Sequence, residues 1–292
     1  MRCLIINLDR SPERWQHVLA EFERQGLVPE RVSAVDANHL PDPAVALPSL
    51  RRGWKPLTDA EVACFLSHRA CWRLVADGSD PVVAIFEDDI VLAEGAGALL
   101  STGNIHTMAD LVKIESHGQP VLLSRRGFTF AEGYRHHRLS SLHLGSAGYL
   151  LTKDGAIQLL ALAESRVPCQ IDHFLFDPSF PVMRYMKVHQ MVPALVKQGR
   201  LLPTWASALG STIRDGVRPT TRLAPSLKIR REAMRLIQQL AALPKTIPSA
   251  VRYVRLRLNH VPHIVPAHCR TAETPLDMET AGAPADPAKA TR

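Results

Sequence analysis

Long apolar runs are absent from this sequence. No uncharged stretch among the 292 residues reaches the roughly 18 apolar residues that a membrane-spanning helix needs, so we expect no transmembrane segment. The apolar start of the chain already ends at Asp9, which is too early for a secretory signal. The 292 residues, 46% of them hydrophobic, are enough for one sizeable core or for a domain plus an appendage.

Cysteine is scarce and irregularly spaced. The sequence has five cysteines, an odd number that argues against a disulfide framework: Cys3, Cys64, Cys71, Cys169 and Cys269. None of them has the paired spacing of a metal motif. We therefore expect reduced thiols in a cytosolic protein.

Acidic residues are few in the C-terminal third. Residues 206–292 hold 14 Lys/Arg and 6 Asp/Glu, a net charge of +8, whereas residues 1–205 carry −1. The stretch 222–257 contains nine basic residues, one acid and a single aromatic, Tyr253. Because nucleic-acid modules interleave aromatics with basic residues, we expect no nucleic-acid partner. The pattern instead favours contact with an anionic membrane surface through residues 222–261, at the cytoplasmic face of the inner membrane.

The nearly neutral body alternates predicted strands with predicted helices. This order predicts an α/β fold with a mainly parallel sheet over residues 1–205. A basic amphipathic helical extension is expected over 206–272, and a disordered tail over 273–292. Strands are predicted at 2–8, 32–35, 82–86, 109–116, 120–124 and 147–152, and helices at 11–26, 58–78 and 153–165.

Three consecutive carboxylates end one of these strands. In "PVVAIFEDDI", residues 81–90, an uncharged run leads into Glu87, Asp88 and Asp89. A divalent cation such as Mg²⁺ or Mn²⁺ would neutralise them and bridge to substrate phosphates. Ligands of such sheets bind at the carboxyl ends of strands, which favours a metal site. The alternative is a solvated turn with surplus acids.

A second group of candidates follows the first strand. In "NLDRSPER", Asn7 and Arg10 stand at the strand end and Arg14 on the first turn of the following helix. Helix N-termini and arginines both favour phosphate or nucleotide binding. The alternative is a well-capped surface helix.

Two further segments carry candidates that are weaker by themselves. In "CFLSHRACW", Cys64, His68 and Cys71 share a helix face near Ser67, but a zinc site there lacks a fourth ligand, so a core histidine is the favoured interpretation. Asp172 is a lone acid among apolar neighbours, where burial could raise its pKa towards that of a general base. His189 is a possible late metal ligand.

In combination and order, these motifs resemble glycosyltransferase family 25, which includes bacterial lipopolysaccharide and lipooligosaccharide galactosyltransferases. The resemblance spans roughly residues 3–198 and is most specific in "SHRACW" and "FEDD". The other matching segments are "IINLDRSPERW", "LTDAEVACFLSHRACWRLV", "GSAGYLLTKDGAIQLL", "IDHFLF" and "VPALVKQ".

The resemblance implies a GT-A type, Rossmann-like nucleotide-sugar-binding domain and an inverting transfer of a hexose. The donor would be a UDP-sugar, most often UDP-galactose, and the cation Mn²⁺ or Mg²⁺. By this resemblance Glu87, Asp88 and Asp89 form a DxD-like motif, with His189 as a third metal ligand by analogy. The donor would contact Asn7, Arg10, Arg14, Ser67, His68 and Asp88, and Asp172, with Glu115 in reserve, would be the catalytic base.

Two other functions and one departure from the family pattern stay open. A metal-dependent phosphohydrolase could use the same acids, although "EDDIV" lacks the Thr of a nucleophilic DxD-x-T arrangement. A non-catalytic membrane-surface protein would use the basic extension alone. The segment 119–141, rich in Arg and His across 125–138, is expected to be either a loop that contacts an anionic glycan acceptor or a solvated loop.

Overall fold

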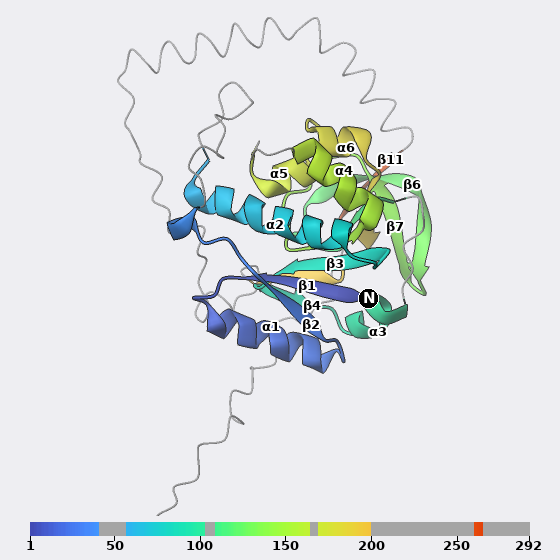
Figure 1. Ribbon diagram of the computed structural model, residues 1–292. Coiled ribbons are helices and arrows are strands. Elements are labelled where there is room, and N and C mark those ends of the chain that lie inside the picture. The colour runs from blue at the N-terminus through green and yellow to red at the C-terminus, as the bar shows by residue number, and fades with distance from the viewer. Residues whose placement is uncertain (41–56, 103–108, 164–168, 200–259, 265–292) are drawn as a thin grey trace, which may run out of the picture.

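The computed structural model describes residues 1–40, 57–102, 109–163, 169–199 and 260–264 (Figure 1). The strands are β1 (Arg2–Asn7), β2 (Pro29–Ser33), β3 (Val82–Glu87), β4 (Ile90–Leu92), β5 (Leu111–Lys113), β6 (Pro120–Ala131), β7 (Tyr134–Leu139), β8 (Gly148–Thr152), β9 (Val188–Val192), β10 (Val196–Gln198) and β11 (His260–Ile264). The α-helices are α1 (Pro12–Arg24), α2 (Asp59–Asp77), α3 (Ala96–Thr102), α4 (Lys153–Ala163), α5 (Ile171–Phe176) and α6 (Pro181–Tyr185), and η1 (Ala37–His39) is a short 3₁₀ turn.

Nine strands form one mixed sheet in the order β11-β6-β7-β9-β5-β8-β3-β1-β2. Strand β1 pairs in parallel with β2 and β3, and β5 pairs in parallel with β9. The α/β class is confirmed, but the prediction of a mainly parallel sheet is wrong. Strand β8 runs antiparallel between β3 and β5, and the pairs β6–β7, β7–β9 and β6–β11 are also antiparallel.

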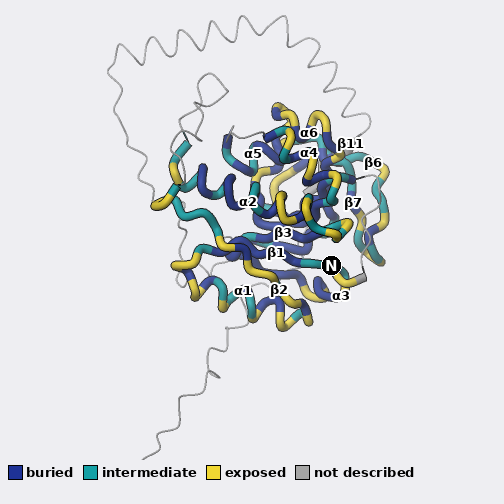
Figure 2. The backbone as a smooth tube through the Cα atoms, viewed as in Figure 1, coloured by how far each residue is buried: buried dark blue, intermediate teal, exposed yellow. Residues whose placement is uncertain are grey.

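Helices cover both faces of the sheet because successive strand residues point to opposite sides (Figure 1). In β1, Leu4 and Ile6 belong to the core formed with α2, α4 and α5. Cys3 and Ile5 belong to a second core formed with α1, α3 and the small β4–β10 sheet. The central strands are consequently buried while the outer side of α1 is exposed (Figure 2).

Local sequence signals explain where the central elements begin. Thr58 caps α2 in a complete capping box with Glu61, as predicted. Strand β2 begins at Pro29, three residues before the predicted segment. The segment predicted as an Arg- and His-rich loop is instead the β6–β7 hairpin, whose turn uses Gly133 with a positive φ of 74°.

The predicted helical extension is only partly testable. Its residues 206–259 and 265–272, and the predicted tail 273–292, lie outside the described residues. Residues 260–264 are not helical, because they form strand β11 and pair with β6. No helix in the described ranges is long and apolar enough to cross a membrane.

Candidate active site

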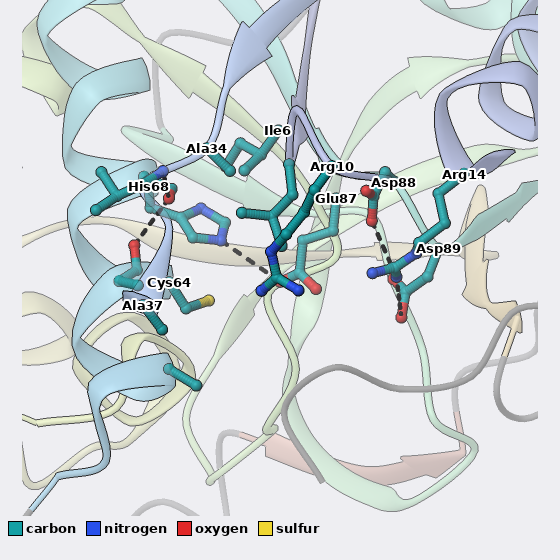
Figure 3. Close-up of a pocket in the computed structure, with 15 residues that line it drawn as sticks. Ile6, Arg10, Arg14, Ala34, Ala37, Cys64, His68, Glu87, Asp88 and Asp89 are labelled. Atoms are coloured by element: carbon teal, nitrogen blue, oxygen red, sulfur yellow. Dashed lines mark hydrogen bonds and ion pairs between the residues drawn. The ribbon is translucent and has the colours of Figure 1, made fainter. Parts of the chain in front are cut away.

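A pocket opens at the carboxyl ends of β1 and β3 (Figure 3). Because these neighbouring strands are parallel, the residues that follow them meet at one edge of the sheet. The start of α1, the turn η1 and the middle of α2 form the walls. Its charged, hydroxyl and thiol-bearing lining residues are Arg10, Arg14, Cys64, Ser67, His68, Glu87, Asp88 and Asp89.

Arg14 lies across two of the three acids. The turn after β1 is closed by a hydrogen bond from Ser11 N to Leu8 O, and it places Arg14 on the first turn of α1. One guanidinium nitrogen lies 2.9 Å from Asp88 Oδ1 and 3.4 Å from Asp89 Oδ2. Because these side chains are deeply buried, the positive charge of Arg14 attracts the two carboxylates more strongly than it would in water.

Asp88 is further held by Asn7. The Asn7 amide donates a hydrogen bond of 2.7 Å to Asp88 Oδ2, and its Oδ1 accepts one of 2.8 Å from Arg31 Nε. Burial raises the pKa of Asp88, although Arg14 and Asn7 both oppose that rise. Both oxygens of Asp88 therefore already have partners in the protein.

Asp89 differs from Asp88 because one of its two carboxylate oxygens has no hydrogen-bond partner among the described residues. That oxygen, Oδ1, is buried. Burial, followed by the charge of Glu87, raises the pKa of Asp89 to about 7. A buried carboxylate oxygen with neither a donor nor a cation is costly, so the residues present fit a bound cation here.

Glu87 points to the opposite wall, formed by α2. Its Oε1 accepts a hydrogen bond of 2.6 Å from Ser146 Oγ and lies 3.4 Å from His68 Nε2. Burial works against ionisation, but His68 and Ser146 together hold the pKa of Glu87 below its usual value. The acids thus divide into a pair bound to Arg14 and a single carboxylate beside His68.

The motif "SHRACW" places His68 in this position through a buried relay. Trp72, one helical turn after His68, donates from Nε1 to Tyr149 Oη, and the same oxygen lies 2.9 Å from His68 Nδ1. Ser67 Oγ donates to Ala63 O and accepts from Val35 N, which ties the segment between β2 and η1 to α2. The helix therefore both orients the imidazole and shapes the wall.

Arg10 occupies the exposed rim of the pocket. Its Nε donates a hydrogen bond of 2.8 Å to Asp36 Oδ2, in an ion pair in which about half of the Arg10 side chain is exposed. Surface pairs of this kind hold their partners weakly, so Arg10 can exchange Asp36 for an anionic ligand.

Comparison with known proteins decides the family. Residues 1–175, more than half of the chain, match the sequence model of Glycosyltransferase family 25 (LPS biosynthesis protein). The chain belongs to glycosyltransferase family 25. It is therefore an enzyme of the glycosyltransferase class, as the resemblance of its motifs predicts.

Relatives of this chain include two named glycosyltransferases and one named lipooligosaccharide biosynthesis protein. The family 25 chain is 31% identical over 157 residues to the lacto-N-neotetraose biosynthesis glycosyltransferase LgtB of Neisseria gonorrhoeae, covering 51% of this chain and 56% of that one. It is 28% identical over 206 residues to LgtE of the same species, covering 66% and 72%. It is 25% identical over 278 residues to the lipooligosaccharide biosynthesis protein lic2B of Haemophilus influenzae, covering 90% and 97%.

Most of the site residues expected from the sequence of this family 25 enzyme meet in the pocket. Arg10, Arg14, Ser67, His68, Glu87, Asp88 and Asp89 line it directly, and Asn7 supports Asp88 from below. Ser146 and Tyr149, which were not candidates from the sequence, contact Glu87 and His68, and Cys64, considered there only in an incomplete zinc set, lines the pocket. Ser146 and Tyr149 stand in "GSAGYLLT", and they reach the site because β8 pairs beside β3.

Asp172 lies near the pocket but does not line it. It stands in the first turn of α5, where its Oδ1 accepts a hydrogen bond from His173 N. Burial raises the pKa of the Cys64 thiol, and the charges of Glu87 and Asp172 add to that rise. The helix α5 that carries Asp172 packs against α2 through Phe174 and Phe65, whose ring centroids lie 5.1 Å apart.

Glu115 is fully occupied by structural partners. Its Oε2 accepts from Lys113 Nζ at 3.0 Å and from Ala147 N at 2.9 Å, and its Oε1 lies 2.8 Å from His117 Nε2. Glu115 and Lys113 are completely buried, and neither lines the pocket. This arrangement favours a structural role over that of a reserve base.

His189 is not placed to bind the same cation as the acids, which corrects that expectation. The register aligns His189 on β9 with Val112, Leu150 and Ala84 on the next three strands. Three strand spacings amount to about 14 Å, and the acids begin three residues beyond Ala84. His189 Nδ1 instead lies 2.9 Å from His136 Nδ1 in a separate buried cluster.

Proposed function

We propose that this family 25 enzyme transfers a hexose, with galactose the first choice, from a UDP-sugar to a lipooligosaccharide or lipopolysaccharide acceptor. The names of its relatives LgtB, LgtE and lic2B support this class of acceptor. The observation that supports donor binding most directly is the pocket at the ends of β1 and β3, where Arg10 and Arg14 line the same cavity as Asp89, whose Oδ1 has no hydrogen-bond partner among the described residues. A GT-A type of nucleotide-sugar domain is consistent with that placement.

Asp89, with Glu87, would hold Mn²⁺ or Mg²⁺ in this proposal. Carboxylate oxygens suit both ions, and Asp89 Oδ1 is the oxygen without a protein partner. When bound, the cation supplies positive charge that stabilises the leaving diphosphate. Asp88 serves to position Arg14 and Asn7 more than to bind the ion, because both its oxygens are engaged.

The remaining donor contacts follow from the walls of the pocket. Arg10 can turn from Asp36 to a phosphate oxygen, and Arg14 adds a second positive charge at the same edge. Ser67 and His68 present the α2 side of the pocket to the nucleotide or the sugar. These groups bind and orient the donor.

The transfer proposed is a single displacement with inversion. An acceptor hydroxyl attacks the anomeric carbon, the bond from that carbon to the UDP oxygen breaks, and UDP leaves with the bonding electron pair. The hydroxyl proton passes to Asp172, which we propose as the general base because its helix α5 packs against α2, and α2 residues line the pocket. Arg10 and Arg14 bear part of the negative charge that develops on UDP.

The test is acceptor-dependent release of UDP. The protein is incubated with UDP-galactose, Mn²⁺ and a lipooligosaccharide core, and a panel of other nucleotide-sugars replaces the donor in parallel. Release only with acceptor supports transfer, whereas equal release without acceptor indicates a phosphohydrolase. Asp172→Asn should abolish transfer and keep UDP binding; unchanged turnover removes Asp172 from the mechanism.

We also propose that the basic segment 222–261 attaches the enzyme to the anionic inner face of the cytoplasmic membrane. Most of that segment lies outside the described residues. Truncation after residue 205 is a poor test, because it also deletes β11 from the sheet. Replacing Arg252, Arg255 and Arg257 by Gln should reduce pelleting with anionic vesicles while activity on soluble acceptor persists; unchanged pelleting would refute the attachment.

A further inference from the structure

Cys64, His68 and Glu87 form a compact group of three different metal-ligating side chains. One ligand atom from each lies within 4.8 Å of the other two, at the α2 wall of the pocket (Figure 3). Cys64 and His68 are one helical turn apart on α2, so they face the same way, and Glu87 reaches them from the end of β3. From the sequence, the helix offered Cys64, His68 and Cys71, a set without a fourth ligand; in the structure Glu87, not Cys71, joins Cys64 and His68.

His68 has an unused nitrogen directed into this group. Its ring is completely buried, and its Nε2 makes no hydrogen bond among the described residues, although it lies 3.4 Å from Glu87 Oε1. Buried polar atoms almost always have a partner, and an atom without one suggests an absent ligand. The other nitrogen, Nδ1, is held by Tyr149 Oη at 2.9 Å.

We propose that Cys64, His68 and Glu87 bind a borderline-soft divalent metal ion of the zinc class. A thiolate, an imidazole and a carboxylate are the ligand types that Zn²⁺ prefers, whereas Mn²⁺ and Mg²⁺ prefer oxygen. The site is therefore distinct in ligand chemistry from the oxygen-only cation site proposed above, with Glu87 shared between them. It does not depend on the transferase activity.

The geometry suits tetrahedral coordination with an open fourth position. Zinc bonds of about 2.1 Å to nitrogen and oxygen place those two ligand atoms about 3.4 Å apart. The observed separation of His68 Nε2 and Glu87 Oε1 is 3.4 Å. The Cys64 sulfur lies within 4.8 Å of both other ligand atoms, so a side-chain adjustment of Cys64 completes the three protein ligands.

The tyrosine–tryptophan relay would serve as the outer shell of the ion. Histidines that bind metal through one nitrogen usually donate their other N–H to an oxygen. Here His68 Nδ1–H would donate to Tyr149 Oη, which also accepts from Trp72 Nε1. The ligand set balances charge as well, because a Cys64 thiolate and a Glu87 carboxylate neutralise a divalent ion.

Binding releases one proton. The Cys64 S–H loses its proton to solvent as the metal–sulfur bond forms, and no electrons are exchanged. Because the metal binds the thiolate and not the thiol, affinity should increase with pH. Occupancy also makes Glu87 a ligand of the zinc ion, so zinc would oppose Mn²⁺ at the neighbouring site, which shares Glu87.

Cobalt titration of the tag-free, full-length protein tests the site. Co²⁺ bound by a thiolate gives a near-ultraviolet charge-transfer band, which Zn²⁺ should abolish by displacement. Cys71→Ser is the matched control, because Cys71 is a buried thiol on the same helix outside the group. We expect the band in the wild type and in Cys71→Ser, and its loss in Cys64→Ser. Loss even of outer-shell partners costs roughly tenfold or more in metal affinity, so Cys64→Ser should weaken Zn²⁺ binding by at least about tenfold.

A second measurement needs no variant. Alkylation of the native protein, followed by peptide mass mapping, should show Cys64 protected by Zn²⁺ but not by Mg²⁺. A cobalt band that survives in Cys64→Ser, or alkylation of Cys64 that Zn²⁺ does not slow, overturns the site. Neither readout uses a donor or an acceptor, so a failed transferase assay leaves this test intact.

Discussion

Arg14 and Asp88 form an ion pair of 2.9 Å in which each side chain is less than a tenth exposed. The pair joins the first turn of α1 to the acidic turn after β3, two segments separated by more than 70 residues. A buried pair of this kind adds little stability over an apolar pair of the same size. Its value here is positional, because it fixes the carboxylates at the edge of the pocket.

Replacing Arg14 by Gln should be strongly destabilising. The change leaves Asp88 and Asp89 buried without their cation, and loss of one partner of a buried pair costs about 3 kcal/mol or more. Urea unfolding at pH 7 measures the free energy of unfolding. The control is Arg10→Gln, because its half-exposed pair with Asp36 is worth at most about 1 kcal/mol. Equal effects of the two changes would contradict a special role for the buried pair.

Asp89→Asn should stabilise the protein above pH 7 and lose that advantage in acid. The native pKa of Asp89 is raised from 3.8 to about 7, chiefly by burial. Between those values the native state keeps a proton that the unfolded chain releases, so this group makes stability fall as pH rises. The gain in the free energy of unfolding from Asp89→Asn therefore grows as pH rises between the two pKa values, to an upper limit of about 4 kcal/mol.

The measurement for Asp89 is unfolding by urea at intervals from pH 4 to pH 8. Asp36→Asn is a control whose effect on the free energy of unfolding should have the opposite sign. Hydrogen bonds from Asn38 and Arg10 lower the pKa of Asp36, so its ionised form stabilises the native state. Added Mn²⁺ should stabilise the wild type and have less effect on Asp89→Asn. A wild type and an Asp89→Asn variant with parallel pH profiles would contradict the raised pKa.

Local patterns explain why much of this site could be predicted. The helix before His68 begins at a capping box, and the strand before Glu87 is a short apolar run, so both signals lie within a few residues. Asn7 and Arg14 are placed by the end of β1 and the start of α1 in the same way. These segments meet because β1 and β3 are parallel neighbours.

Long-range pairing explains what could not be predicted. Nothing in the residues of β8 specifies that it enters antiparallel between β3 and β5, yet this brings Tyr149 and Ser146 to the site. The same uncertainty made His189 a candidate ligand, since its distance from the acids depends on which strands intervene. Strand order is set by contacts across the whole sheet, which sequence periodicity does not record.

Tyr149→Phe should destabilise the protein and disturb His68. The change removes the acceptor of Trp72 Nε1 and the partner of His68 Nδ1, both inside the core. An unsatisfied buried donor costs roughly 1–3 kcal/mol. Thermal and urea unfolding measure the cost, and Tyr185→Phe is the control because that ring is 66% exposed. If both changes were neutral, the relay would not hold His68.

Lys113 and Glu115 provide a test of how a buried pair supports the sheet next to the site. Both are fully buried, and Lys113 Nζ also donates to Leu144 O and Gly145 O and lies 4.5 Å from the centre of the Phe176 ring. Lys113→Met should cost about 3–5 kcal/mol, because Glu115 then keeps only His117 and Ala147 N as partners.

The double variant Lys113→Met with Glu115→Gln distinguishes a coupled pair from two independent packing positions. Removing both charges avoids an uncompensated buried ion, so its loss of stability should be smaller than the sum of the single losses by about 1 kcal/mol or more. Urea unfolding of the four proteins at one pH gives the coupling free energy. Additive losses would mean that each side chain acts through packing alone, without a coupled charge pair.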